Sequence, residues 1–114
     1  MVSARASGRK AAISIAIVAA SRASHLRAAI LKEFHANIPA VRAEAGCIEY
    51  GPAIDTDALG PAQANLGPDT FMVIEKWESA EALKAHAKAP HMLAYGARTK
   101  DMVANRAIHV LTPA

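Results

Sequence analysis

EAGCIEY at residues 44–50 and FMVIEKWES at residues 71–79 are the two stretches that decide the fold of this chain. Gly46 is placed to end a helix in a left-handed conformation, and the residues that follow it have the composition of a strand. The unbroken apolar run that opens the second stretch favours a central strand over residues 70–78. Two successive strands with no helix between them give the central β-β unit of the element order.

Upstream of this block, the chain predicts a first strand and a long helix. Isoleucines alternate with small residues over residues 11–20, which is the period-two pattern of a strand. Either Ser21 or Ser24 is suited to cap the helix that follows. The apolar stripe of that helix continues to residue 45. Pro39 lies within the stripe and predicts a kink or a division near Asn37, because proline removes a backbone donor.

Pro52 predicts that the strand over residues 47–54 lies at an edge of the sheet or contains a bulge, because proline cannot donate to a neighbouring strand. Its apolar residues are expected on one side of the strand: Ile48, Tyr50 and Ile54. Two Gly-Pro pairs in residues 55–69 predict a long loop. A tolerated insertion is the favoured interpretation of this loop, ahead of a flap over a pocket.

Downstream, two shorter helices and a last strand are expected. Ser79 can cap a helix that reaches about residue 88, and Pro90 suits the first turn of another that reaches about residue 102. Alternation returns over residues 105–111. The order β-α-β-β-α-β is the ferredoxin-like pattern, an α+β fold with a four-stranded antiparallel sheet and helices on one face. The other face needs cover, which predicts a homodimer.

The length of 114 residues predicts one domain, at residues 11–114, behind a flexible arm at residues 1–10. The net charge is +3, and the arm carries that excess, so the body has no basic patch for nucleic acid. Aromatic residues, at 4%, are too few for base stacking. No apolar run approaches the roughly 20 residues that cross a membrane. The single cysteine, Cys47, fits a reducing cytoplasm.

Three side chains are the candidates for chemistry. Glu75 and Trp77 are two residues apart on a strand, so they share a face. His86 follows by helical spacing from an apolar position and is expected to face inward as a base or substrate anchor. Glu75 would then orient His86, accept a substrate proton, or form a structural ion pair. Trp77 would be a pocket wall that orients substrate oxygen, or plain core.

Four further residues are expected around a substrate pocket: Tyr50, His91, Tyr95 and Arg98. For His91, helix-terminus packing is the stronger alternative, and for Tyr95 core packing is an equal one. Arg98 would hold an anionic substrate or form a surface salt bridge. His86 and His91 are five apart across a proline, which is not the spacing of two ligands on one helix face, so no metal site is expected. Cys47 is expected to be an inert, buried thiol.

Four motifs in order resemble the antibiotic biosynthesis monooxygenase (quinol monooxygenase) family. The family pattern is acidic-x-Gly-Cys-x-x-Tyr, apolar-Glu-x-Trp-x-Ser, Ala-Leu-x-x-His and Pro-His. This chain has EAGCIEY at 44–50, IEKWES at 74–79, ALKAH at 82–86 and PH at 90–91. The resemblance implies a dimeric α+β barrel with a pocket between the sheet and helices of each protomer. It also implies oxygenation of quinols or polyketide anthrones without metal, flavin or haem.

The chain departs from the family at three positions. Polyketide-oxidising members use an Asn and a Tyr where this chain has Val73 and Leu83, and haem-degrading members use a His ligand where it has Gly96. The resemblance therefore favours a cofactor-independent monooxygenase that uses O2 on a hydroquinone-like or polycyclic aromatic substrate. An isomerase of a small hydroxy-carbonyl compound is a second expectation, which Arg98 in the pocket would favour. A non-catalytic ligand-binding or stress-response dimer is a third.

Overall fold

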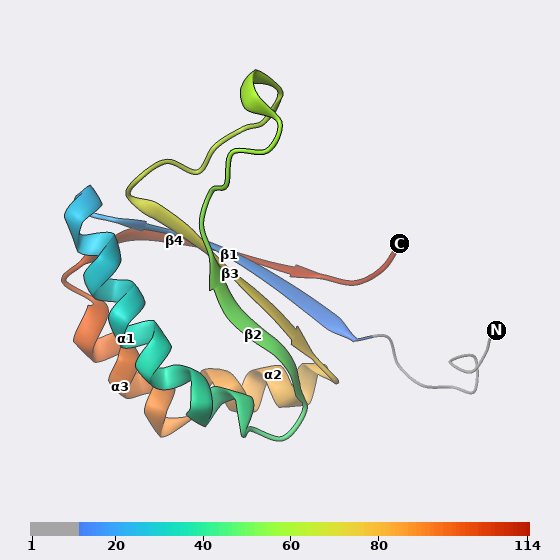
Figure 1. The fold of residues 1–114 in the computed structure, drawn as a ribbon. Helices are drawn as coiled ribbons and strands as arrows, with labels where there is room; N and C mark the ends of the chain where they lie inside the picture. The colour runs from blue at the N-terminus through green and yellow to red at the C-terminus, as the bar shows by residue number, and fades with distance from the viewer. Residues whose placement is uncertain (1–11) are drawn as a thin grey trace.

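The computed structural model describes residues 12–114, so the arm expected at residues 1–10 lies outside it. The described chain folds into one sheet with helices against one of its faces (Figure 1). Its elements are β1 (Ile13–Ser21), α1 (Ser24–Arg42), β2 (Cys47–Ala53), a short 3-10 helix (Gly60–Ala62), β3 (Thr70–Trp77), α2 (Ala80–Ala87), α3 (Pro90–Thr99) and β4 (Val103–Leu111). This is the predicted β-α-β-β-α-β order, with the second helical segment broken in two.

The sheet has the strand order β2-β3-β1-β4, and every neighbouring pair is antiparallel. The ferredoxin-like α+β fold is therefore confirmed, as are a central β3 and an edge β2. Alternation along β3 turns Phe71, Val73, Glu75 and Trp77 toward the helices, and all four are buried. Together with Phe34 and Ile30 of α1, the apolar members of this row form the main core.

Helix α1 runs without interruption from Ser24 to Arg42, so of the two predicted effects of Pro39, a kink or a division near Asn37, the division is wrong. The proline removes the donor for the carbonyl of His35, and both Pro39 and His35 are exposed. That carbonyl can therefore bond to water, which lowers the cost of a proline inside a helix. The helix also lacks the predicted serine cap. The Ser21 hydroxyl instead bonds the carbonyls of Ala23 and Asp69, at 2.7 and 2.8 Å.

Two local predictions in the chain after α1 hold. Gly46 has a φ of +86°, which is the left-handed conformation expected of it, although it lies in the turn after the helix rather than at its end. Ser79 caps α2, because its hydroxyl accepts the Ala82 N–H at 3.1 Å. Both features set the position of α2, the helix that carries His86.

Strand β2 does not keep its apolar residues on one side, as expected from alternation. Its register against β3 shifts between Cys47 and Glu49, which breaks the alternation at Ile48. Ile54 lies just beyond the end of the strand at Ala53. Tyr50 is buried against the helices, whereas Ile48 and Ile54 are about half exposed. The correction matters for the site, because Tyr50 alone of the three is buried.

The connection between β2 and β3 projects from one end of the sheet, away from the helices (Figure 1). It is an ordered loop, since the Asp55 carboxylate accepts the Leu66 and Gly67 N–H groups at 2.8 and 2.9 Å. These bonds hold the pKa of the Asp55 carboxyl below its usual value. Among the described residues that line the cavity below, none comes from this loop.

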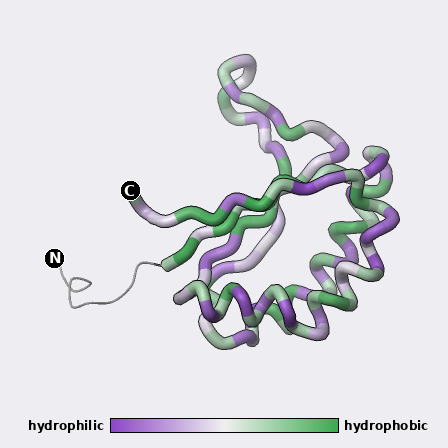
Figure 2. Tube along the Cα trace, turned by 180° about the vertical axis from the view of Figure 1, so that it is seen from behind, coloured by the Kyte–Doolittle hydropathy of each residue, from purple (hydrophilic) through white to green (hydrophobic). Residues whose placement is uncertain are grey.

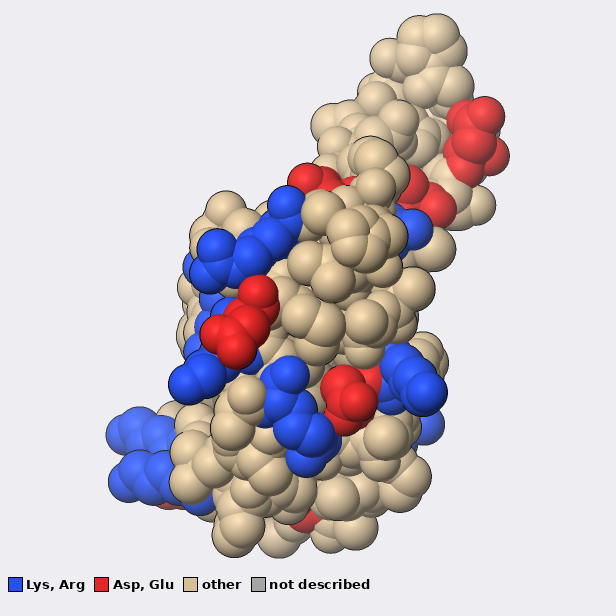
Figure 3. Space-filling view, turned by 90° about the vertical axis from the view of Figure 1, so that its left-hand side faces the viewer, with Lys and Arg blue, Asp and Glu red and all other residues tan. Residues whose placement is uncertain are grey.

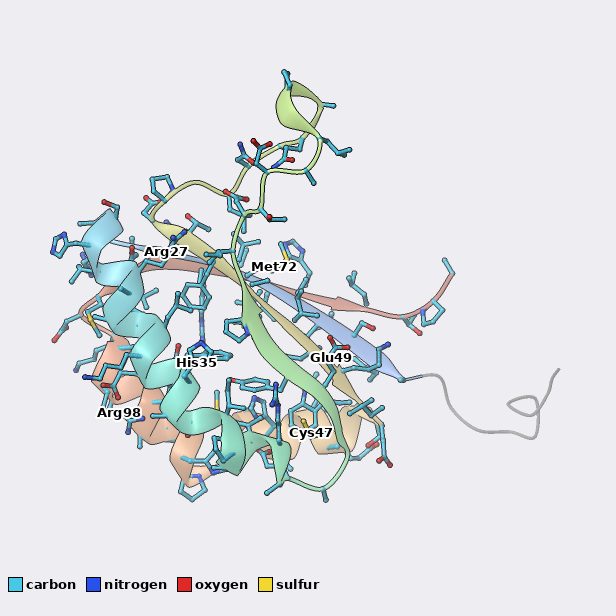
Figure 4. The ribbon with its side chains drawn as sticks, in the orientation of Figure 1. Arg27, His35, Cys47, Glu49, Met72 and Arg98 are labelled. Carbon is cyan, nitrogen blue, oxygen red and sulfur yellow. The ribbon has the colours of Figure 1, made fainter. Side chains whose placement is uncertain are left out.

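The second face of the sheet lacks helical cover in the described chain (Figure 1). Hydrophobic residues recur along the strands (Figure 2), and on this outer face Ile74 and Leu111 remain 41% and 51% exposed. Met72 and Glu49 also lie on this side, away from the helices (Figure 4). Within residues 12–114, no helix has the length and apolar character needed to cross a membrane.

Candidate active site

A cavity of about 540 Å³ lies between the sheet and the three helices, a volume typical of small-molecule sites. Its walls are mainly apolar and come from β1, β3 and β4 on one side and from α1, α2 and α3 on the other. We call the end of the cavity next to β2 and α2 its inner end. The lining residues at this end are Tyr50, Phe34, Val73, Glu75, Leu83 and His86. A flat organic ring fits such a space better than a strongly hydrated ligand does.

Glu75 is the buried carboxylate of this cavity. It lies on β3 with only 3% of its surface exposed, and its Oε1 accepts the indole N–H of Trp77 at 2.8 Å. Burial raises the pKa of Glu75 above its usual 4.5, while the Trp77 N–H and a positive charge on His86 oppose the rise. A carboxylate with a raised pKa is a stronger base than one at the surface, so Glu75 is suited to accept a proton from a ligand.

His86 lies next to Glu75 on α2 and is 4% exposed. Its Nδ1 is 2.9 Å from Oε2 of Glu44, and its Nε2 is 3.9 Å from Oε1 of Glu75. An ionised carboxylate only accepts hydrogen bonds, so Glu44 favours the tautomer that carries its proton on Nδ1. Nε2 is then left with a lone pair, and it can accept a proton from a substrate hydroxyl.

Glu44 is the site residue that sequence reasoning missed. The same oxygen that binds His86 is 2.7 Å from Nε2 of His91, so one carboxylate joins the two histidines. Glu44 lies in the turn between α1 and β2, while the histidines belong to α2 and α3. The acidic position of the acidic-x-Gly-Cys motif was the available signal. The turn uses only the backbone of Glu44, so its carboxylate is a candidate partner for the motif histidines.

Aromatic side chains form the wall beside Glu75, since Tyr50 is the residue of β2 paired with Glu75 on β3. Tyr50 stacks on Phe34 with ring centroids 4.9 Å apart, and it meets His86 edge-on at 5.5 Å. Burial, reinforced by the charge of Glu75, raises the pKa of Tyr50, so its phenol stays protonated. Burial also raises the pKa of Tyr95 to about 12, against the opposing charges of Arg106 and Arg98. Both phenols are therefore neutral groups that can donate hydrogen bonds to a ligand.

The structure places four of the seven expected site residues on the cavity wall: Tyr50, Glu75, His86 and Tyr95. Trp77 is fully buried, and its ring centroid lies 4.6 Å from that of His86. It is not among the described residues that line the cavity. Of the two alternatives for Trp77, its complete burial agrees with plain core, and its N–H is bonded to Glu75. Trp77 supports Glu75 and His86 from behind.

The other two expectations that change are His91 and Arg98, neither of which is among the described lining residues. His91 is held by Glu44, which agrees with the alternative of a structural contact at a helix start. Arg98 faces α1 and bonds Glu33 at 2.6 Å, so it is the surface salt bridge that the sequence left open (Figure 4). Basic and acidic side chains are interspersed over this side of the molecule (Figure 3).

Cys47 lies at the start of β2, and burial and the charge of Glu44 raise the pKa of its thiol. A raised pKa keeps a thiol protonated and poorly nucleophilic, which agrees with the expected inert thiol, although Cys47 is only half-buried. In the described part of the chain, no three His, Cys, Asp or Glu side chains are grouped in a way that could hold a metal ion.

The class of protein follows from this geometry: an α+β ferredoxin-like domain with an apolar cavity between sheet and helices. Solved structures share the fold. PA3566 from Pseudomonas aeruginosa has a TM-score of 0.76 at 23% identity, covering 93% of this chain and 97% of its own. Rv0793 from Mycobacterium tuberculosis has a TM-score of 0.73 at 25% identity, covering 90% and 95%.

Residues 15–98 match the family described as "Antibiotic biosynthesis monooxygenase", and the chain belongs to that family. A curated relative in Escherichia coli K12, named "Probable quinol monooxygenase YgiN", is 39% identical over 89 residues, which are 78% of this chain and 85% of the relative. The protein of the same name in Shigella flexneri is equally similar. The resemblance inferred from the four motifs is thereby confirmed.

Proposed function

We propose that this protein is a monooxygenase that uses O2 to oxygenate a hydroquinone-like or polycyclic aromatic substrate, with no resident metal or organic cofactor. The observation that carries the proposal is the pairing of Glu75 and His86 at the inner end of an apolar cavity. The name of the relative YgiN points to the same substrate class.

The protein's first task is to remove a proton. A hydroquinone hydroxyl placed against Nε2 of His86 or Oε1 of Glu75 loses its proton to that base, and the O–H bond breaks as N–H or O–H forms. Glu44 stabilises the imidazolium that results, because its carboxylate accepts the Nδ1–H at 2.9 Å. Glu44 acts through His86 and is therefore a positioning residue, with His91 as the second donor that holds its carboxylate in place.

The remaining chemistry belongs to the substrate and O2. The hydroquinone anion passes one electron to O2, and the two radicals join in a carbon–oxygen bond to form a peroxide anion. The peroxide takes back a proton. The ring carbon that carries it then loses its own hydrogen as a proton to a base while the O–O bond breaks, so that a C=O bond forms, the released hydroxide and that proton make water, and a hydroxyquinone remains. One hydroquinone and one O2 thus yield one hydroxyquinone and one water, so no outside reductant is required.

The walls suit this sequence because they exclude water from a reactive anion. The positions at which the family's polyketide-oxidising and haem-degrading members carry functional residues, Val73, Leu83 and Gly96, all line the cavity here. Apolar or absent side chains at these positions favour the quinol monooxygenase branch. They widen the apolar space and supply no further polar group.

We also propose that the protein acts as a homodimer, a dimeric α+β barrel in which the outer faces of two sheets meet. The half-exposed apolar residues on that face, Ile74 and Leu111, support it, because burying them removes apolar surface from water. Size-exclusion chromatography with light scattering should give twice the chain mass at micromolar concentration. A monomer under those conditions would rule the dimer out.

The two other expected functions receive less support. The isomerase expectation relied on Arg98 in the pocket, but Arg98 is bound to Glu33. A non-catalytic ligand-binding function would be favoured by a pocket closed by Tyr50 and Met92 with no base in reach of a ligand. Both residues do line the cavity, but Glu75 and His86 line it as well.

An oxygen electrode tests the proposal with a panel of reduced benzo- and naphthoquinones, each corrected for its uncatalysed oxidation. We expect His86→Ala and Glu75→Gln each to lower kcat by about 10²-fold or more, the usual loss when a general base is removed. His35→Ala is the matched control, because His35 is an exposed histidine of α1 outside the described walls. With ¹⁸O2, one labelled atom should enter the product and one should enter water. Oxygen uptake that is indifferent to both substitutions would refute the assignment.

A further inference from the structure

The end of the cavity between the C-terminus of α3 and β4, here called its outer end, carries charged side chains that the proposed oxygenation does not use. Two basic residues, Lys100 and Arg106, line it there. Arg106 is paired in the sheet with Ala19, whose side chain faces the helices and is 7% exposed. Because paired residues share a face, the arginine side chain is directed to the helix side of β4, over the cavity.

These two cations lack an acidic partner in the described chain. The ion pairs of residues 12–114 involve Glu33, Glu44 and Glu75, and none of them includes Lys100 or Arg106. The nearest basic neighbour on α3, Arg98, already uses Glu33. Residues 1–11 contain no Asp or Glu, so they bring no side-chain carboxylate either. The positive charge at this end is therefore available to a ligand.

Lys100 and Arg106 are both exposed, and they lie at the solvent-facing rim of the cavity that they help to line. Arg106 is the strongest of the charges that lower the pKa of Tyr95, whose phenol lines the same cavity. A guanidinium in this position presents up to five N–H donors, in a geometry that matches a carboxylate.

The separation of the two ends defines the ligand. Glu75 is paired with Ile15 on β1, and Arg106 is paired with Ala19. Four residues along a strand span about 13 Å, so the acid–base end and the basic end are that far apart along the sheet. Apolar side chains line the interval, among them Ile15, Ile17, Val73 and Ile108. A ring at one end and an anion at the other, joined by an apolar spacer, match this layout.

We propose that Lys100 and Arg106 form an anion-binding subsite and that the substrate is a hydroquinone with a carboxylate on a short apolar chain. This inference rests on the proposed function for the identity of the ring. The apolar interval makes a compact phosphorylated carbonyl compound a poor match, because its polar groups would leave the interval empty and lie against apolar walls.

Binding without turnover separates the subsite from the oxygenation. The probes are two oxidised naphthoquinones of equal chain length, one ending in a carboxylate and the other in the corresponding primary amide, titrated calorimetrically. We expect the wild type to bind the carboxylate about tenfold more tightly than the amide, since hydrogen bonds to a charged group are the stronger kind. Arg106→Gln should remove most of that preference while leaving the Kd of the amide unchanged, and Lys100→Gln should remove part of it.

Arg98→Gln is the matched control, because it deletes an arginine of α3 that is paired with Glu33 and lies outside the described walls. It should keep the wild-type preference. Raising the salt concentration should weaken the carboxylate probe alone. Equal binding of the two probes by the wild type, or equal loss of both in Arg106→Gln, would overturn the subsite. Tight carboxylate binding with no oxygen uptake from the reduced probe would instead leave the subsite standing and refute the monooxygenase.

Discussion

Gly46→Ala should be among the most damaging single-methyl changes in this protein. Gly46 has a φ of +86°, a conformation that costs a residue with a Cβ about 1–2 kcal/mol. A Cβ at this position would lie 2.6 Å from the Cβ of Ala82, well inside van der Waals contact. Forcing a methyl into packed surroundings typically costs a further 1–3 kcal/mol or so. The sum is a loss of about 2–5 kcal/mol, a large part of the stability of a small domain.

The change should also reach the active site. Gly46 lies between Glu44 and the start of β2, and Ala82 lies on α2 one turn before His86. Relief of the overlap requires α2 to move away from the turn, which lengthens the bond between Glu44 and His86. We therefore expect kcat to fall even in conditions where Gly46→Ala remains folded.

Urea denaturation measures the first effect, and Gly60→Ala is the control that isolates backbone strain. Gly60 also has a positive φ, +59°, but a Cβ there would meet no atom within 4 Å. It should lose only the strain contribution, so Gly46→Ala should be the more destabilising of the two by about 1–3 kcal/mol. Ala82→Gly should recover part of that difference in a double-mutant cycle. Equal losses in the free energy of unfolding for Gly46→Ala and Gly60→Ala, with no recovery in Ala82→Gly, would refute the steric overlap with Ala82.

Three further predictions concern α2, α3 and the buried carboxylate. Because burial raises the pKa of Glu75 in the folded protein, this residue contributes stability that is fully present below its unfolded-state pKa of 4.5 and is lost as pH rises through the folded-state pKa. Chemical denaturation across this pH window should therefore show the wild type losing stability relative to Glu75→Gln. Parallel stability curves for the two proteins would contradict the burial argument. Ser79→Ala removes the cap of α2 and should cost about 1 kcal/mol by denaturation, whereas Ser79→Asp should retain most of it. Gly96→Ala should stabilise α3 by roughly 0.5–1 kcal/mol, because a Cβ there meets nothing within 4 Å, and a lower Tm would contradict this.

Much of the fold was predictable because its signals are local. The alternation in β1, the apolar run that opens β3, and the caps and breaks at Ser79 and Pro90 each depend on a few neighbouring residues. The edge position of β2 followed from Pro52 for the same reason. The continuity of α1 through Pro39 did not follow, because it depends on where solvent lies.

The candidate site divides in the same way. That Glu75 and Trp77 share a face, and that His86 turns inward, could be inferred from strand and helix periods. That the Trp77 N–H is already bonded to Glu75 could not, because spacing places side chains on a face but does not select their partners. The sequence also offered Arg98 as the pocket cation, whereas the fold brings Arg106 and Lys100 to the cavity instead.

The sequence alone determined the order of the elements, the family and the shared face of Glu75 and Trp77 on β3, since these reside in residue periods and motifs along the chain. Only the tertiary structure decided that Glu44 would meet His86 and His91, which lie 42 and 47 residues further along. The same holds for the two cations and the two bases, which lie at opposite ends of one cavity. The physical reason is that hydrogen bonds and charges act over a few ångströms in space, and the sheet and helices must pack before those distances exist.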